Sequence, residues 1–331
     1  MANSIPIVTI FGGSGFVGRY VTQRMARAGW RVRVAVRRPD EALFVRPLGV
    51  VGQVEPIQAN IRDEASTRAA IAGADAVINC AGILVETSWQ SFDAVQAEGA
   101  ARVARIATDE NVRTMVHVSA IGADASSDSD YARSKAEGET AVLDAFPGAV
   151  ILRPSVIFGI EDGFFNKFGA MARYSPVLPV VGPDVRFQPV YVDDVAAAAA
   201  TAVIDGGYSG IYELGGPEVA TFRDLLNQLV KTVDRRRIVV AVPGWIARIQ
   251  AGMLDLAQNW SFGLFTNNIL TADQVRMLSS DKVVADDARG LADFGISHTP
   301  MEVILPGYLY CYRPHGQFDD ILESAQNLRQ R

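Results

Sequence analysis

The stretch VTIFGGSGFVGRYVTQRMARAG, residues 8–29, decides the fold. Its first four residues form an apolar run that predicts a buried strand, and the pattern after Gly18 is that of an amphipathic helix. The glycines between them permit a tight turn, and they let backbone N–H groups approach a pyrophosphate at the helix N-terminus. A turn that binds nothing is the less favoured alternative. The predicted pyrophosphate site comprises Gly12, Gly13, Ser14, Gly15, Phe16, Val17 and Gly18.

Strand and helix patterns alternate over the first 155 residues. Short β-branched runs predict strands at 5–11, 31–36, 54–59, 75–81, 113–119 and 149–155, and helical patterns lie at 15–28, 64–72, 91–110 and 132–145. Such alternation indicates an α/β protein with a parallel sheet covered on both faces. We therefore expect a Rossmann-type doubly wound parallel sheet.

The rhythm changes after Pro154, where glycine, proline and aromatic residues become frequent. This change predicts a smaller, interleaved C-terminal α/β lobe. The expected dinucleotide-binding domain covers 1–158, with 187–205 returning to it. The expected C-terminal lobe and partner-docking tail cover 159–186 and 206–331.

Composition narrows the class of protein. The chain has 331 residues and a net charge of −6, which argues against nucleic-acid binding. Two cysteines give no disulfide framework and fit a reduced compartment, and three scattered histidines do not indicate a metal site. No apolar run reaches the roughly 18 residues needed to cross a bilayer, and the start shows no targeting pattern. We expect a soluble or peripheral protein.

The end of the second predicted strand distinguishes NADP from NAD. An NAD site usually carries an acidic residue about 20 residues after the glycines to bind the ribose 2′-hydroxyl. Here Arg37 and Arg38 occupy that place, and guanidinium groups suit a 2′-phosphate. The sequence therefore favours NADPH or NADP over NAD. A solvated basic turn is the alternative.

Two further segments follow predicted strands at the edge where such sheets bind ligands. Asn60 and Asp63 follow the third strand, and Cys80, Ala81 and Gly82 follow the fourth. We expect both segments to line the adenosine part of the site. A helix cap or a tight turn explains each of them about as well.

Tyr131 and Lys135 are four residues apart, which places them on one face of a helix. In a reductase, Tyr131 would donate a proton to a carbonyl, Lys135 would lower the pKa of the phenol and bind the ribose, and Ser119 would orient the substrate oxygen. The same pair could also serve only to bind the cofactor, or could be a surface tyrosine beside a solvated lysine.

Several motifs together resemble an extended or atypical short-chain dehydrogenase/reductase: GGSGFVG (12–18), NCAG (79–82), HVSAIGA (117–123), YARSKAEGE (131–139), LRPSVIFG (152–159), QPVYVDDVA (188–196) and YELGGPE (212–218). More narrowly, the segments 152–168, 186–198 and 293–313 resemble the family of NADPH-binding accessory subunits of respiratory complex I, and a sister group acts in ubiquinone biosynthesis. That resemblance implies a tightly held NADPH near the quinone-side junction of the two arms.

The resemblance also assigns residues. It implies that Pro154 and Ser155 form the loop over the nicotinamide. It further implies a peripheral location on the inner membrane, at the cytoplasmic face in a bacterium or the matrix face in a mitochondrion, with other complex I subunits as partners. The loop from Ser119 to Tyr131 is shorter than in active enzymes of the class, which favours a structural cofactor.

Two alternatives stay open. One is an active NADP-dependent reductase or epimerase acting on a quinone precursor or another lipid-like substrate, and the other is an NADPH-sensing binding protein. A separate feature is the apolar, tryptophan-containing stretch 243–265, which predicts either a membrane-surface contact or a packed helix. The final residues 319–331 are polar and predict a loose or partner-ordered end.

Overall fold

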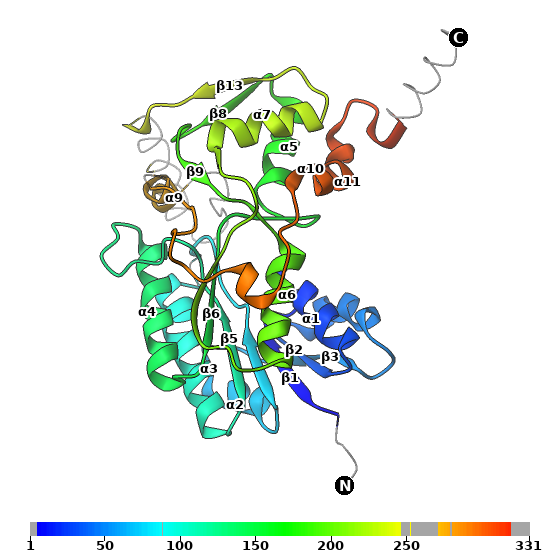
Figure 1. Ribbon diagram of the computed structural model, residues 1–331, viewed down its shortest axis with the longest axis vertical. Coiled ribbons are helices and arrows are strands. Elements are labelled where there is room, and N and C mark those ends of the chain that lie inside the picture. Colours follow the sequence, from blue (N-terminus) through cyan, green and yellow to red (C-terminus); the bar gives the residue numbers. More distant parts are fainter. Residues whose placement is uncertain (1–4, 88, 246–251, 253–270, 279, 319–331) are drawn as a thin grey trace.

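A computed structural model describes residues 5–87, 89–245, 252, 271–278 and 280–318 (Figure 1). Its centre is a seven-stranded sheet with the strand order β11-β6-β5-β4-β1-β2-β3, in which every neighbouring pair is parallel. The strand order reverses between β1 and β4, where ligands bind in sheets of this kind. The predicted Rossmann-type doubly wound sheet is confirmed.

The strands form where buried β-branched residues are concentrated, because parallel strands are covered on both faces. Val8, Ile10, Val34, Ile78 and Val116 are completely buried. The six strands predicted in the first 155 residues are all present. They are β1 (Ile7–Phe11), β2 (Arg31–Val36), β3 (Val54–Gln58), β4 (Ala76–Asn79), β5 (Thr114–Val118) and β6 (Val150–Pro154).

Helices cover both faces of this sheet (Figure 1). On one face lie α1 (Phe16–Arg27) and α6 (Val192–Ile204), whose buried residues share a core with Val8, Ile10 and Val34. The run of buried alanines in α6, 196–200, leaves room for a close approach to α1. On the other face lie α2 (Glu64–Ile71), α3 (Glu98–Asp109) and α4 (Asp130–Ala145).

A second lobe stands above the carboxyl ends of the strands (Figure 1). Its core is rich in phenylalanine, and edge-on contacts join Phe164, Phe168 and Phe222. Three two-stranded sheets and several helices surround this core. They are β7 (Ile157–Phe158), α5 (Phe165–Tyr174), β8 (Val177–Val180), β9 (Arg186–Phe187), β10 (Val190–Tyr191), β12 (Ala220–Thr221), α7 (Phe222–Thr232), β13 (Ile238–Ala241), α9 (Ala272–Met277), α10 (Met301–Ile304) and α11 (Pro306–Leu309).

One predicted boundary is wrong. All of 206–331 was predicted to belong to the C-terminal lobe, but β11 (Gly210–Leu214) is the edge strand of the main sheet and pairs with β6. Leu291 and Phe294 also pack in the core beneath that sheet. The chain therefore stays in the first lobe after α6, and β11 covers the edge that β6 would otherwise expose. The other boundaries stay predictions.

Two predicted features lie largely or wholly outside the described residues. Of the stretch 243–265, the structure describes only 243–245 and 252, and it does not describe 319–331. Within the described residues, no helix has both the length and the apolar character that a bilayer crossing requires.

Candidate functional site

The glycine turn has the form expected of a dinucleotide site. Gly12 has a φ of +70°, which is a left-handed conformation that glycine adopts without strain. The Gly12 amide donates to the Ala35 carbonyl at 3.1 Å, and the Gly15 amide donates to the Gly12 carbonyl at 2.9 Å. These bonds close the turn and leave the first-turn amides of α1 to point out of the helix N-terminus.

Gly18 shows why the third glycine is required. A Cβ atom at this position would lie 2.2 Å from the carbonyl oxygen of Gly12 and 2.7 Å from the Cα of Gly13. These are backbone atoms and cannot move aside, so any side chain would push the helix away from the turn. The close packing keeps the N-terminus of α1 directly against the turn, which is the cradle that a pyrophosphate needs.

Arg37 and Arg38 follow β2 and are both exposed. The guanidinium of Arg38 forms a 2.8 Å ion pair with Glu41, and its pKa is raised by this hydrogen bond and charge. An exposed pair of this kind contributes little stability and exchanges readily for a better partner. The two arginines therefore remain accessible to a 2′-phosphate, and this assignment stays a prediction.

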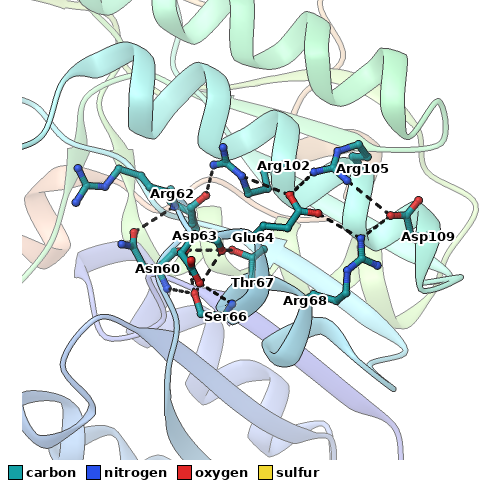
Figure 2. A network of polar contacts seen from close by, with 11 residues as sticks. Asn60, Arg62, Asp63, Glu64, Ser66, Thr67, Arg68, Arg102, Arg105 and Asp109 are labelled. Carbon is teal, nitrogen blue, oxygen red and sulfur yellow. Dashed lines mark hydrogen bonds and ion pairs between the residues drawn. The ribbon is translucent and has the colours of Figure 1, made fainter.

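Asp63 caps a helix, and Asn60 forms part of the turn that precedes it (Figure 2). Asp63 is the N-cap of α2 and accepts a 2.7 Å hydrogen bond from the Ser66 amide, which lowers the pKa of its carboxyl group. The Asn60 side chain accepts from the Arg62 amide at 3.1 Å. The cap that the sequence left open is thus present, and the predicted contact of these residues with a cofactor stays a prediction.

An ionic network joins α2, the helix that Asp63 caps, to α3 (Figure 2). Glu64 pairs with Arg105 and with Arg68, and Arg68 also reaches Asp109 at 2.8 Å. All four side chains are substantially exposed. The network therefore holds two surface helices in register and offers no enclosed site.

The end of β4 lies directly against the glycine turn. A Cβ on Gly12 would be 3.1 Å from backbone atoms of Cys80 and Ala81, and the Cys80 amide donates to the Phe11 carbonyl at 2.9 Å. Burial raises the pKa of the Cys80 thiol to about 12, which disfavours the reactive thiolate form. On the opposite side of this segment, a Cβ on Gly82 would lie 3.4 Å from the Lys135 ammonium. Predicted site residues from three separate segments therefore converge here.

Tyr131 and Lys135 lie in the first two turns of α4 and are buried, being only 8% and 5% exposed. The Lys135 ammonium donates to the Val118 carbonyl at the end of β5 at 3.2 Å and lies 5.9 Å from the centre of the Tyr131 ring. Burial lowers the pKa of Lys135 to about 8, although Glu139 opposes the shift. The alternative of a surface tyrosine beside a solvated lysine is therefore wrong.

The electrostatic expectation for Tyr131 is also wrong. A reductase would use Lys135 to lower the pKa of the phenol, but burial and the Asp273 carboxylate raise it to about 12. Asp273 caps α4 from a distant part of the chain: it accepts hydrogen bonds from the Ser129 hydroxyl at 2.8 Å and from the Asp130 amide at 2.7 Å. Asp273 was not predicted, because no local pattern connects α9 to this helix.

Three buried polar atoms have no hydrogen-bond partner within the described residues. They are the Ser119 hydroxyl, His117 Nε2 and Gln96 Oε1. The Asn79 side-chain oxygen accepts a hydrogen bond from the Ala81 amide, which orients the Asn79 Nδ2 toward His117 Nδ1 at 3.2 Å. Because Nδ2 can only donate, Nδ1 accepts this bond and the imidazole carries its proton on Nε2. Burial, followed by the Lys135 charge, lowers the pKa of His117 to about 3 and keeps the ring neutral.

Ser119 was predicted, whereas Gln96 and His117 were not. A π-helical turn at Asp93–Ala97 brings Gln96 against α4, and such turns are frequent at functional sites. Buried polar groups without partners usually hold a water molecule or a ligand. Their position beside the Tyr131–Lys135 pair supports a polar ligand on this side of the sheet.

Pro154 is the last residue of β6 and Ser155 follows it, and their predicted place over the nicotinamide stays a prediction. The Ser155 hydroxyl donates to the Lys282 carbonyl at 2.6 Å and accepts from the Gln188 amide at 3.2 Å. A segment far along the chain therefore closes this side of the site.

The residues present fit a dinucleotide. The turn offers unbonded amides and a helix N-terminus for a pyrophosphate, the exposed arginines follow β2, and Lys135 and the Ser119 hydroxyl lie beyond the end of β5. A nicotinamide group would supply hydride chemistry at this place. The chain's own contribution is a buried ammonium, a phenol that stays protonated at neutral pH and a free hydroxyl group.

Comparison with known proteins agrees with this geometry. Residues 8–215 match the NAD dependent epimerase/dehydratase family. The NADH dehydrogenase (ubiquinone) 1 alpha subcomplex subunit 9 of Arabidopsis thaliana mitochondria is 35% identical over 316 residues, which is 94% of this chain and 79% of the relative. The subunit of the same name from Dictyostelium discoideum is 32% identical over 97% of this chain and 88% of its own length.

A solved structure shares the fold. The NADPH-dependent quinone oxidoreductase of Escherichia coli, complexed with NADPH, superposes with a TM-score of 0.69 over 91% of this chain and 98% of its own. Its sequence identity is 20%, so the likeness extends to the fold alone.

Proposed function

This chain belongs to the NAD dependent epimerase/dehydratase family, and from that premise we propose that it is an NADP(H)-binding accessory subunit of respiratory complex I, the NADH:ubiquinone oxidoreductase. Its partners are the other subunits of that complex. It is a peripheral protein of the inner membrane, at the cytoplasmic face in a bacterium or the matrix face in a mitochondrion.

One observation carries this proposal. The similarity to mitochondrial complex I subunits extends over 94% and 97% of this chain, and thus over both lobes. A shared nucleotide-binding unit alone would give similarity confined to the first lobe. Similarity through the C-terminal lobe supports a shared partner surface as well as a shared nucleotide site.

The cofactor we propose is NADPH, held at the glycine turn with its 2′-phosphate at Arg37 and Arg38. A nucleotide that binds only the folded state adds about 2.7 kcal/mol of stability when its free concentration is 100 times its dissociation constant. The raised pKa of Tyr131 supports this structural role, because its phenol is a weaker acid than a free tyrosine. The nucleotide therefore stabilises the fold and, through it, the assembly.

The test uses the native protein. A tagged chain is recovered from membranes in mild detergent, the co-migrating proteins are identified, and the bound nucleotide is measured before and after addition of NADH and a quinone. We expect migration with complex I and one NADP(H) per chain that does not turn over. Migration apart from complex I would overturn the proposal.

A second candidate function is supported by the Ser119 hydroxyl, which is buried and has no hydrogen-bond partner within the described residues. In that case the chain is an NADP-dependent reductase acting on a quinone precursor or another lipid-like substrate. The Tyr131→Phe variant separates the two functions. It would abolish turnover in a reductase and leave an accessory subunit with unchanged nucleotide content.

A further inference from the structure

We propose that Lys282 forms an anion-binding subsite on the substrate side of the nucleotide site, which selects a ligand carrying a carboxylate or a phosphate group. Lys282 lies outside the family-matched residues 8–215. The inference rests on the proposed nucleotide site, and it adds a ligand class that neither complex I assembly nor NADP(H) binding requires.

The backbone of Lys282 is fixed against the predicted nicotinamide loop. Its carbonyl accepts the Ser155 hydroxyl at 2.6 Å, and its amide donates to the Arg186 carbonyl at 2.8 Å. Two residues later, the Val284 amide donates to the Gln188 side chain at 3.1 Å. These bonds hold the segment in one place, so the position of the side chain is set by the fold.

The Lys282 side chain lies against the loop that follows β5. A Cβ atom built on Gly122 would lie 2.7 Å from the Lys282 ammonium and 3.4 Å from its Cδ and Cε atoms. Gly122 belongs to the short loop that begins at Ser119 and ends at Tyr131. Lys282 therefore contacts both the Ser155 loop and the Ser119 loop, which are joined by a 2.9 Å hydrogen bond from the Ile121 amide to the Pro154 carbonyl, and a glycine at 122 leaves room for its ammonium.

Asp281 is the nearby acidic residue that acts on the Lys282 charge, and within the described residues it forms its ion pair with Arg186 instead. The Nζ donates to the Ser280 hydroxyl at 2.7 Å, and no carboxylate of the described residues forms an ion pair with it. The neighbouring carboxylate of Asp281 is taken by Arg186, which contacts it through its amide, Nε and Nη2 at 2.7–2.8 Å. Half-burial lowers the pKa of Lys282, so its charged form is less favourable than in water.

The other groups on this side also donate hydrogen bonds. Ser119 offers a buried hydroxyl without a partner, and the Tyr131 phenol stays protonated at neutral pH because its pKa is raised. Two lysines and two hydroxyl groups make this part of the site rich in donors. Such a set matches a ligand whose oxygens are acceptors, and the Lys282 charge favours an anionic one.

The experiment compares two probes that differ only in charge. Binding of 4-fluorophenylacetate and of its neutral amide is measured by fluorine NMR on the full chain, with and without NADP⁺, and phenyl phosphate distinguishes a phosphate ligand from a carboxylate. The variants are Lys282→Met, which keeps the length without the charge, and Lys282→Arg, which keeps the charge. Lys231→Met, an exposed lysine of α7, is the matched control.

We expect the wild type to bind the carboxylate or the phosphate at least tenfold more tightly than the amide. Lys282→Met should lose this preference, Lys282→Arg and Lys231→Met should keep it, and NADPH affinity should change less than twofold in all three. Equal binding of charged and neutral probes by the wild type, absence of probe binding, or an unchanged preference in Lys282→Met would overturn the proposal. Failure of the wild type to bind NADPH would instead contradict the proposed function. The two failures can be told apart, because probe binding is also measured without nucleotide.

Discussion

Glu139 of α4 and Arg153 of β6 form a buried two-pronged ion pair one helical turn after Lys135. The Arg153 Nε lies 2.9 and 3.1 Å from the two Glu139 oxygens, and the Glu139 side chain is only 4% exposed. Arg153 also lies 3.6 Å from Glu213 of β11. The pair therefore joins the helix of the Tyr131–Lys135 motif to the edge of the main sheet.

The first prediction concerns Glu139→Gln. This change removes a carboxylate from a buried pair and leaves the Arg153 charge with only its weaker partner, so we expect a loss of about 3 kcal/mol in the free energy of unfolding. Urea denaturation measures it. Glu137→Gln, at an exposed position on the same helix, is the control and should change stability by less than about 0.5 kcal/mol. Equal effects of the two changes would refute the role of the pair.

The second prediction concerns pH. Burial lowers the pKa of Lys135 from 10.5 to about 8, so between these values the unfolded chain binds more protons than the folded one. The contribution of Lys135 to the free energy of unfolding is therefore constant below about pH 8. Above that pH it rises by up to about 1.4 kcal/mol per pH unit. The test compares wild type with Lys135→Met by urea denaturation from pH 7 to pH 10. A constant difference between the two proteins would contradict the lowered pKa.

The third prediction concerns the 2′-phosphate. Arg38→Gln should weaken NADPH binding about tenfold while NADH binding stays the same, because only NADPH offers a second anion to the guanidinium. Glu41→Gln should strengthen NADPH binding, since it removes the carboxylate that now pairs with Arg38. Titration calorimetry measures both. Arg31→Gln, at the other end of β2, is the control. A parallel loss of NADH affinity in Arg38→Gln would show that Arg38 does not recognise the 2′-phosphate.

The fourth prediction concerns Asp273→Asn. The amide keeps a hydrogen-bond acceptor near the N-terminus of α4 but loses the charge, so we expect a loss of about 1 kcal/mol in stability. The pKa of Tyr131 should fall from its raised value of about 12, because Asp273 contributes to that shift. NMR of ¹³C-labelled tyrosine during an alkaline titration measures the pKa. The control is Asp128→Asn, at an exposed position in the loop before α4, which should leave the pKa of Tyr131 unchanged.

The local patterns were sufficient for most of the first lobe. β-branched runs located six strands of the sheet, and the spacing of Gly12, Gly15 and Gly18 located the turn between β1 and α1. These features depend on neighbours in the chain and on burial of a whole strand, so composition and periodicity reveal them. The edge strand β11 was missed, because its place depends on pairing with β6 and the surrounding sequence has the glycine-rich character of the second lobe.

The candidate site was predictable only in part. Tyr131, Lys135 and Ser119 were found, because a four-residue spacing and a strand end are visible in the sequence. Asp273 and Lys282 were not, since each reaches the site from more than 120 residues away along the chain.

The sequence by itself determined the parallel sheet, the glycine turn and the pairing of Tyr131 with Lys135, because short-range sterics and helical spacing dictate them. Only the tertiary structure decided the chemistry of that pair. Burial lowers the pKa of Lys135 and, with the Asp273 carboxylate, raises that of Tyr131. Desolvation and charge depend on which distant segments pack around a group, and no local pattern of residues records that.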